Sequence, residues 1–270
     1  MPELPEVETS CRGIAPWVEN EEIHSVIIRE RRLRWPVSEE IELELPGKTI
    51  QSVQRRAKYI LFATASGTAM LHLGMSGSVR IIDWDEPAGK HDHFDIRFKN
   101  GNALRFRDPR RFGSFLWAAN PFEHRLLRNL GPEPLSTAFN GEYLWMKSRG
   151  RKVSIKQFIM NGSIVVGVGN IYASEALFSS GIHPKRRAGR IALSRMVTLV
   201  DAIKEVLQSA IKAGGTTLRD FSAGDGSPGY FKRQLNVYDR ANQPCRSCQT
   251  PLSAAVLGQR STFYCKICQR

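Results

Sequence analysis

Four of the five cysteines of this 270-residue chain form two Cys-x-x-Cys pairs, a pattern that supplies ligands for a metal ion. The pairs are Cys245 with Cys248 and Cys265 with Cys268, and sixteen residues separate them. Two thiolates from each of two tight turns complete a tetrahedral shell around Zn²⁺, and a closed shell of this kind has a structural role. Two disulfides are the alternative, but no secretory signal precedes them, so we expect one structural zinc ion.

Two short loops carry side chains that could deform a stack of bases. Residues 74–77 set Met75 between glycines at the end of a predicted strand, and residues 108–113 bring Phe112 next to Arg110. Apolar wedges inserted into DNA unstack its bases, and arginine can read base edges. A core methionine reached by a bend is the alternative for Met75. Wedges of this kind suit an enzyme that flips a nucleotide out of the duplex.

The charge of the chain favours a polyanionic partner. The formal net charge is +13, and the basic residues gather in four separate clusters, at residues 29–34, 107–111, 147–152 and 185–190. Nucleic acid is the first partner to expect, an anionic membrane surface the second, and a merely basic soluble protein the third possibility. With no long apolar run and no signal peptide, we expect a cytoplasmic protein without a membrane segment.

An amphipathic helix is predicted at the N-terminus, followed by β-strands. The apolar positions at helical spacing are Leu4, Val7, Cys11, Ile14 and Val18, so Cys11 is assigned to the core. Strands are predicted at residues 50–63 and 69–73. Residues 94–98 and 104–106 alternate with period two around an Asn-Gly turn, which is a strong hairpin signal.

The pattern changes after a segment rich in proline and glycine at residues 130–134. A short helix is predicted from Asn170 to about Ser180, and a longer one over residues 194–213. The stripe of the longer helix comprises Val197, Val200, Ile203, Leu207 and Ile211. Two helices joined by a glycine-containing turn indicate a helix-turn-helix-like unit. Between the cysteine pairs, turn residues and a β-prone run predict a hairpin with Arg260 near its tip; a phosphate contact and a solvated loop arginine are both open for Arg260.

Five motifs resemble bacterial formamidopyrimidine-DNA glycosylase, in order and from end to end of the chain. They are MPELPEVET (residues 1–9), HLGMSG (72–77), RDPRRFG (107–113), GVGNIYASEALF (167–178) and QRSTFYC (259–265). The resemblance implies an α+β multidomain protein. Its parts are an N-terminal β-sandwich with an amphipathic helix (residues 1–130), a linker (131–140), a helix-two-turn-helix DNA-binding domain (141–235) and a zinc-finger β-hairpin (236–270).

The implied function is base excision repair of damaged double-stranded DNA. The resemblance makes the chain a bifunctional glycosylase and abasic-site lyase that removes 8-oxoguanine and formamidopyrimidines, acting as a monomer in the bacterial cytoplasm at the nucleoid. A glycosylase of the endonuclease VIII branch, specific for oxidised pyrimidines, is the first alternative. A non-catalytic zinc-hairpin DNA-binding protein is the second, although such a protein has no need of a free terminal amine.

The resemblance also assigns roles to individual residues. Pro2 is the nucleophile once Met1 is removed, Glu3 transfers protons, Glu6 assists it, and Lys58 contacts the lesion phosphate. The implied DNA contacts are His72, Met75, Arg110, Phe112, Lys156, Asn170, Tyr238 and Arg260.

Plainer explanations exist for some of these residues. Acidic residues favour the first turn of any helix, and this alone explains Glu8. Asn170 could serve as a simple helix cap. The segment Asn161-Gly162-Ser163 departs from the family pattern, and the glycine-rich stretch at residues 222–229 is predicted to be a mobile lid.

Overall fold

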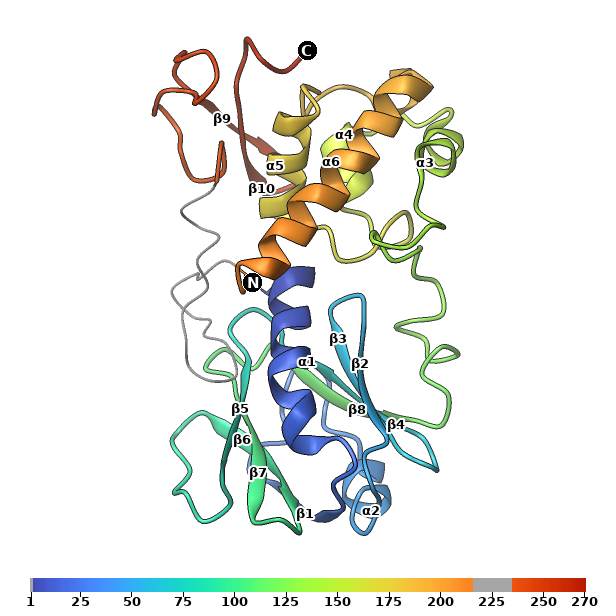
Figure 1. The fold of residues 1–270 in the computed structure, drawn as a ribbon, viewed down its shortest axis with the longest axis vertical. Helices are drawn as coiled ribbons and strands as arrows, with labels where there is room; N and C mark the ends of the chain where they lie inside the picture. Colours follow the sequence, from blue (N-terminus) through green and yellow to red (C-terminus); the bar gives the residue numbers. More distant parts are fainter. Residues whose placement is uncertain (1, 216–234) are drawn as a thin grey trace. The chain divides into compact units, whose positions relative to one another are not determined.

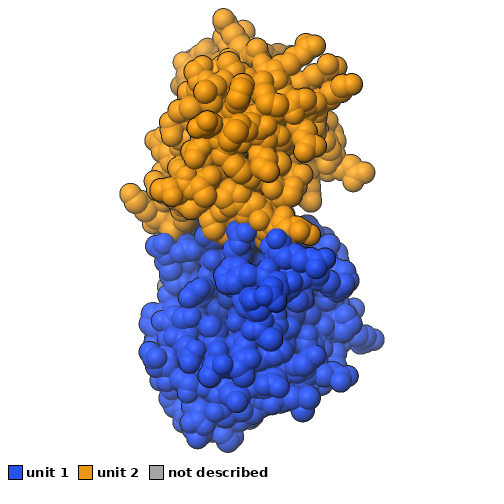
Figure 2. Space-filling model, turned by 90° about the vertical axis from the view of Figure 1, so that its right-hand side faces the viewer, with its two compact units in different colours: residues 1–128, 213–232 blue, residues 129–212, 233–270 orange. Residues whose placement is uncertain are grey.

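The computed structural model describes residues 2–215 and 235–270. Its contacts divide the chain into two compact units (Figure 2). Unit 1 comprises residues 1–128 and 213–232, and unit 2 comprises residues 129–212 and 233–270. The predicted lid at residues 222–229 lies outside the described residues. The finer predicted boundaries of the linker, the helical domain and the hairpin stay predictions.

Unit 1 contains two four-stranded antiparallel sheets, ordered β1-β6-β7-β5 and β2-β3-β4-β8 (Figure 1). Its elements are α1 (Leu4–Val18), β1 (Ile23–Ile28), α2 (Glu40–Glu44), β2 (Ser52–Arg56), β3 (Tyr59–Ala63), β4 (Thr68–His72), β5 (Ser78–Asp83), β6 (Asp92–Phe98), β7 (Asn102–Arg107) and β8 (Ser114–Ala118). The sequence-based expectation of a β-sandwich with an N-terminal helix is therefore confirmed.

The helix α1 packs its apolar stripe against strands of both sheets, namely β2, β3 and β5. The five predicted stripe residues are all buried, and Cys11 is among them. Burial raises the pKa of the Cys11 thiol to about 12, so this side chain behaves as a small apolar group, as predicted. Glu8 forms ion pairs with Arg12 and Arg55, which ties the exposed face of α1 to β2.

Aromatic side chains join the two sheets at the centre of unit 1. Phe94 on β6 stacks on Phe115 on β8, with ring centroids 4.3 Å apart, and also on Phe106 on β7 at 5.0 Å. The predicted hairpin is formed by β6 and β7, and Gly101 in its turn has φ of 88°. The alternating apolar residues of these strands therefore form the core, as their period predicts.

The strand predicted over residues 50–63 is instead two strands, β2 and β3, which pair with each other. Ala57 has φ of 55° and reverses the chain there. This left-handed conformation is unusual for a residue with a Cβ, so the pattern of residue types gives no turn signal. The tight turn sets Lys58 directly before β3.

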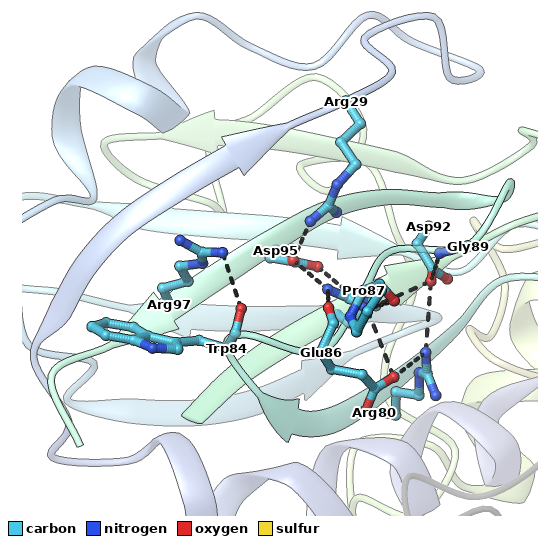
Figure 3. Close-up of polar contacts among 10 residues, drawn as sticks. Arg29, Arg80, Trp84, Glu86, Pro87, Gly89, Asp92, Asp95 and Arg97 are labelled. Carbon is cyan, nitrogen blue, oxygen red and sulfur yellow. Dashed lines mark hydrogen bonds and ion pairs between the residues drawn. The ribbon is translucent and has the colours of Figure 1, made fainter. Parts of the chain in front are cut away.

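A network of buried charges lies on the other face of the β6–β7 hairpin (Figure 3). Arg105 and Asp95 are both 0% exposed, and two hydrogen bonds of 2.8 Å join the guanidinium to the carboxylate. Arg105 also donates to the carbonyl oxygens of Glu86 and Pro87, and Arg29 donates to Asp95. Burial alone would raise the pKa of Asp95, but the hydrogen bonds from the two arginines lower it below its usual value.

The chain crosses between the two sheets three times, after β1, β4 and β7, and the last two crossings lie at the same end of unit 1. One crossing, residues 73–77, links β4 to β5, and the other, residues 108–113, links β7 to β8. Because β4 pairs with β8 and β5 pairs with β7, the two crossings start and end on neighbouring strands. We name them the Met75 loop (residues 73–77) and the Arg110 loop (residues 108–113).

Unit 2 combines helices with a β-hairpin. Its elements are α3 (Gly141–Ser148), α4 (Ile155–Ile159), α5 (Asn170–Ser179), the 3-10 helix η1 (Ala188–Arg190), α6 (Leu193–Lys212), β9 (Ser253–Leu257) and β10 (Arg260–Tyr264). The predicted helix pair is α5 and α6, which pack together, and Gly214 follows α6 with φ of 74°. None of the helices in the described ranges is long and apolar enough to cross a bilayer.

The predicted stripe of α6 is partly correct. Val200, Ile203 and Leu207 are buried, but Val197 is 44% exposed. A Cβ placed on Gly141 of α3 would lie 2.4 Å from the Val197 side chain. Val197 therefore covers a close approach between α3 and α6 at the edge of the core, a position that helical periodicity does not distinguish from its centre.

Replacement of Arg105 by methionine is expected to lower the free energy of unfolding by about 3–5 kcal/mol, because it removes the buried cation that pairs with both Asp95 and Asp92. Urea denaturation measures this loss. Arg107→Met is the matched control, since Arg107 lies on the same strand but is exposed. A similar small effect of both substitutions would show that the buried network contributes little.

Candidate functional site

Two carboxylates are buried at the start of α1, directly after Pro2. Glu3 is the N-cap residue, and its side chain accepts a hydrogen bond from the backbone N–H of Glu6. In return, Glu6 Oε2 accepts from the backbone N–H of Glu3 over 2.9 Å. Both side chains are 2% exposed, and Pro2 is buried as well. This reciprocal capping box fixes the direction in which the chain enters the helix, and so fixes the position of Pro2.

The Glu6 carboxylate also lies close to Gly215, which has φ of 81°. A Cβ at Gly215 would be 3.1 Å from Glu6 Oε1. Glycine at this position therefore permits both the left-handed backbone and the close approach to the carboxylate. Glu6 thus lies between Glu3 at the start of α1 and Gly215, which follows α6.

Lys58 and His72 form a second part of the site, at the turn before β3 and the end of β4. Tyr59 and His72 are cross-strand partners, so Lys58 lies beside the imidazole. Burial lowers the pKa of His72 to about 4, helped by the positive charges of Lys58 and Arg34. His72 Nδ1 accepts a hydrogen bond from the backbone N–H of Gly74 over 2.9 Å. The ring is therefore neutral near pH 7, with Nε2–H left as a donor.

The Met75 and Arg110 loops present the predicted wedge residues. Met75 lies half-buried in the turn after β4, and Phe112 is 40% exposed. The Arg110 guanidinium lies 4.9 Å from the centre of the Phe112 ring, so the two side chains stack as one unit. Unit 1 therefore carries eight of the predicted site residues: Pro2, Glu3, Glu6, Lys58, His72, Met75, Arg110 and Phe112.

Unit 2 gathers the other predicted contacts around one backbone carbonyl. The oxygen of Ser261 accepts hydrogen bonds from Asn170 Nδ2 and Lys156 Nζ, each over 3.0 Å. Lys156 also donates to Thr262 Oγ1 over 2.8 Å. Asn170 Nδ2 is 3.5 Å from the Tyr238 hydroxyl. These contacts bring α4, α5, the segment before the hairpin and β10 together one residue from Arg260.

The structure changes the interpretation of two of these side chains, Asn170 and Lys156. Gly169, not Asn170, is the N-cap of α5, so the plain capping role considered for Asn170 is wrong. Lys156 is 1% exposed, because its ammonium is directed at the hairpin. Its predicted contact with DNA stays a prediction, whereas its support of β10 is direct.

The four cysteines of the two Cys-x-x-Cys pairs meet in one cluster. Their Sγ atoms all lie within 4.8 Å of one another, and the separation from Cys248 to Cys265 is 3.5 Å. Disulfide sulfurs lie about 2 Å apart, whereas thiolates bound to one Zn²⁺ at about 2.3 Å lie close to the observed spacing. The cluster is therefore able to bind a metal ion such as zinc, and the two-disulfide alternative is wrong.

The hairpin next to this cluster is tight at its tip. Leu257 pairs with Arg260, and both residues of the turn, Gly258 and Gln259, have positive φ. This is the geometry of a two-residue hairpin whose twist matches its strands. Arg260 is exposed as the first residue of β10.

Sequence reasoning missed two buried acids that organise these elements. Glu175 on α5 accepts hydrogen bonds from three successive backbone N–H groups, those of Asn236, Val237 and Tyr238. Asp108 in the Arg110 loop accepts from both wedge loops. Each lies inside a motif quoted above, but residue type alone does not separate an acid that binds backbone from one on the surface.

Comparisons with known proteins agree along the whole chain. Residues 1–115 match the family model described as formamidopyrimidine-DNA glycosylase N-terminal domain. Residues 130–222 match the model described as formamidopyrimidine-DNA glycosylase H2TH domain. Formamidopyrimidine-DNA glycosylase of Pseudomonas aeruginosa is 55% identical over 270 residues, covering 100% of both chains. The protein of the same name from Pseudomonas putida is 54% identical with the same coverage.

Solved structures give the same result. A Lactococcus lactis glycosylase in complex with DNA containing an abasic site has a TM-score of 0.92 at 33% identity, covering 100% of both chains. A mutant of that protein in complex with DNA containing a formamidopyrimidine nucleotide gives the same values. The Thermus thermophilus protein has a TM-score of 0.89 at 33% identity, covering 99% of this chain.

The low pKa of His72 predicts a pH-dependent stability. The unfolded chain takes up a proton on this residue below about pH 6.5, whereas the folded chain does so only near pH 4. Stability is therefore lost as the pH falls, by about 2 kcal/mol between pH 7.5 and pH 5 from this residue alone. Urea denaturation of His72→Gln should show a smaller decrease over this interval than the unmodified protein. His24→Gln, at an exposed position, serves as the control and should keep the full decrease. An unchanged decrease in His72→Gln would contradict the assignment.

Proposed function

The chain belongs to the formamidopyrimidine-DNA glycosylase family, and from this premise we propose that it excises oxidised purines from duplex DNA and cleaves the strand at the resulting abasic site. The observation that carries the proposal is the buried pair of carboxylates, Glu3 and Glu6, locked directly behind Pro2. The capping box explains how the two acids are held, and their place beside a terminal amine is what a site for proton transfer needs.

Pro2 is proposed as the nucleophile. Removal of Met1 frees a secondary amine whose pKa is ordinarily about 8, so part of it is neutral near pH 7. The amine attacks C1′ of the damaged nucleotide, and the base leaves with the electrons of the glycosidic bond. The amine then gives up its N–H proton, and the C1′–O4′ bond breaks as O4′ takes a proton, which leaves a ring-opened iminium that is positively charged without being protonated. The iminium draws electrons from C2′, whose proton is lost as the 3′ phosphate leaves, and a second proton, from C4′, is lost as the 5′ phosphate leaves.

The two acids supply the proton transfers that these steps need. Glu3 is the closer in sequence, and we assign to it the opening of the sugar ring and the assistance to elimination. Glu6 holds Glu3 through its hydrogen bond to the Glu3 backbone, and we assign to it a positioning and relay role.

The polar contacts of both units are proposed to hold the phosphates around the lesion. Lys58 supplies a charge and the neutral His72 a directed N–H donor. Asn170, Tyr238 and Arg260 contribute from unit 2, where the shared Ser261 carbonyl holds Asn170 close to the strand of Arg260. Phosphate contacts position the duplex but do not specify the lesion. Met75, Arg110 and Phe112 fill the space left by the flipped nucleotide and address the opposite base.

The cysteine cluster is proposed to hold one structural Zn²⁺, with Cys245, Cys248, Cys265 and Cys268 as ligands. The metal would fold a segment whose own core is small and so keep the Arg260 turn rigid. Damaged double-stranded DNA is the proposed partner, and relatives have been solved in complex with DNA that contains a formamidopyrimidine nucleotide or an abasic site. We propose that the chain acts as a monomer in the cytoplasm at the nucleoid.

The Schiff base of Pro2 can be trapped by reduction. Borohydride added to the protein and a duplex with 8-oxoguanine opposite cytosine should give a covalent adduct that maps to Pro2. Pro2→Gly, or a tag retained ahead of Pro2, should abolish excision while duplex binding survives, because the amine is changed and the binding residues are not. Normal excision by either form would show that another group is the nucleophile. A preference for oxidised pyrimidines would favour the endonuclease VIII alternative. If no damaged duplex gave an adduct, the non-catalytic DNA-binding protein would be the favoured alternative.

Loss of the metal should weaken DNA binding. Cys265→Ser is expected to lose its zinc, measured by elemental analysis, and to bind duplex DNA at least about tenfold more weakly, since the hairpin unfolds without its metal. Cys11→Ser is the matched control, because Cys11 lies in the core of unit 1 and should leave one zinc per chain. Full affinity after verified metal loss would remove the role assigned to the hairpin.

A further inference from the structure

The Met75 and Arg110 loops are held together by one buried carboxylate. Asp108, at the start of the Arg110 loop, is 0% exposed. Its Oδ1 accepts from the Ser76 hydroxyl over 2.7 Å and from the backbone N–H of Arg110 over 3.2 Å. Its Oδ2 accepts from the backbone N–H of Gly113 over 2.8 Å. Among the described residues, the hydrogen bonds to this carboxylate thus come from the two wedge loops, one from the first and two from the second.

The backbone of Asp108 is fixed from the opposite side. Its N–H donates to the carbonyl of His91 over 3.0 Å, and its carbonyl lies 2.7 Å from His93 Nε2. Both histidines flank the first residue of β6, Asp92, which ion-pairs with the buried Arg105 (Figure 3). The backbone of Asp108 is therefore anchored to the start of β6.

The two loops also touch through their backbones. Gly74 has φ of 69°, and a Cβ there would lie 2.4 Å from the carbonyl carbon of Phe112. The N–H of the same glycine donates to His72 Nδ1. One continuous set of contacts thus runs from His72 through the Met75 loop to Phe112 and Asp108.

We propose that Asp108 is a positioning residue that locks the Met75 and Arg110 loops into a single rigid wedge, so that the three inserting side chains enter the duplex together. This inference rests on the proposed function. A carboxylate is suited to the task because all three of its partners are donors, and it can accept from each of them. It acts on Met75, Arg110 and Phe112 through their backbone and does not itself contact DNA.

The isosteric variant Asp108→Asn tests the role of the acceptor. An amide keeps one oxygen, so its NH₂ group must face either the N–H of Gly113 or that of Arg110. We expect excision from a duplex with 8-oxoguanine opposite cytosine to fall about 10- to 100-fold. Cleavage of a single-stranded oligonucleotide with an abasic site should stay within about threefold, since it leaves no gap in a duplex to fill.

A direct optical readout separates insertion from folding. A 2-aminopurine placed beside an uncleavable abasic analogue brightens when its stack is opened, and Asp108→Asn should lose most of this rise. Asp95→Asn is the matched control: it is the same change at an equally buried acid of the same unit, but its partners are Arg29 and Arg105. It should keep the full rise even if its stability is lower.

Ser76→Ala supplies a smaller perturbation should Asp108→Asn fold poorly. It removes only the hydrogen bond from Ser76 to Asp108, which joins the two loops. Duplex excision should weaken about three- to tenfold, and the double variant Ser76→Ala with Asp108→Asn should lose no more than Asp108→Asn alone. An equal loss on duplex and single-stranded substrates, or an unchanged 2-aminopurine signal, would overturn the proposal. If the unmodified protein excises nothing, the proposed function fails, whereas the 2-aminopurine signal still decides the role of Asp108, because it needs no excision.

Discussion

The arrangement of unit 1 depends on two strand pairings that coincide. β4 pairs with β8 in one sheet, and β5 pairs with β7 in the other. The chain passes from β4 to β5 and from β7 to β8, so the two crossings run side by side at the same end of the sandwich. The Met75 and Arg110 loops, which are far apart in sequence, are thereby brought into contact. As a result Met75, Arg110 and Phe112 form one surface. The strand pairings bring the two loops together, and the contacts between the loops then fix the wedge residues.

The second constraint is that a buried charge needs partners, and three buried carboxylates of the chain obtain them in the same way. Asp95, Asp108 and Glu175 are each buried, and each is surrounded by N–H, O–H or guanidinium donors. A buried carboxylate without such donors would be costly, but with several it fixes the groups that donate to it. These acids therefore determine where loops lie. Glu3 and Glu6 follow the same rule at the start of α1, where each carboxylate holds the backbone of the other residue.

Much of the fold and of the candidate site could be predicted from the sequence, because it depended on local signals. Helical spacing identified α1, and period-two alternation around Asn100-Gly101 identified the β6–β7 hairpin. The spacing of the cysteines predicted a cluster that the structure forms. The roles of Pro2, Glu3 and Lys58 came from motifs and not from any property visible in the residues alone.

The failures share a cause as well. Asp95 and Arg105 occupy the polar positions of an alternating pattern, which indicates solvent, yet both are buried because each is the partner of the other. The turn at Ala57 has no turn residue, and the burial of Lys156 follows from its hydrogen bond to the carbonyl of Ser261, 105 residues away. Such features depend on contacts between segments distant in sequence, and no local pattern contains them.

The neutrality of His72 bears on how the protein would respond to ionic strength. Neutralising a phosphate with a cation releases bound counterions, and added salt weakens such a contact, whereas a neutral N–H donor releases none. On the proposed function, His72, Asn170 and Tyr238 are neutral donors, while Lys58 and Arg260 are charged. Binding at the damaged nucleotide would then be less sensitive to salt than the initial binding of DNA by the basic clusters. A higher ionic strength would thus weaken binding to intact DNA more than it weakens binding to a lesion.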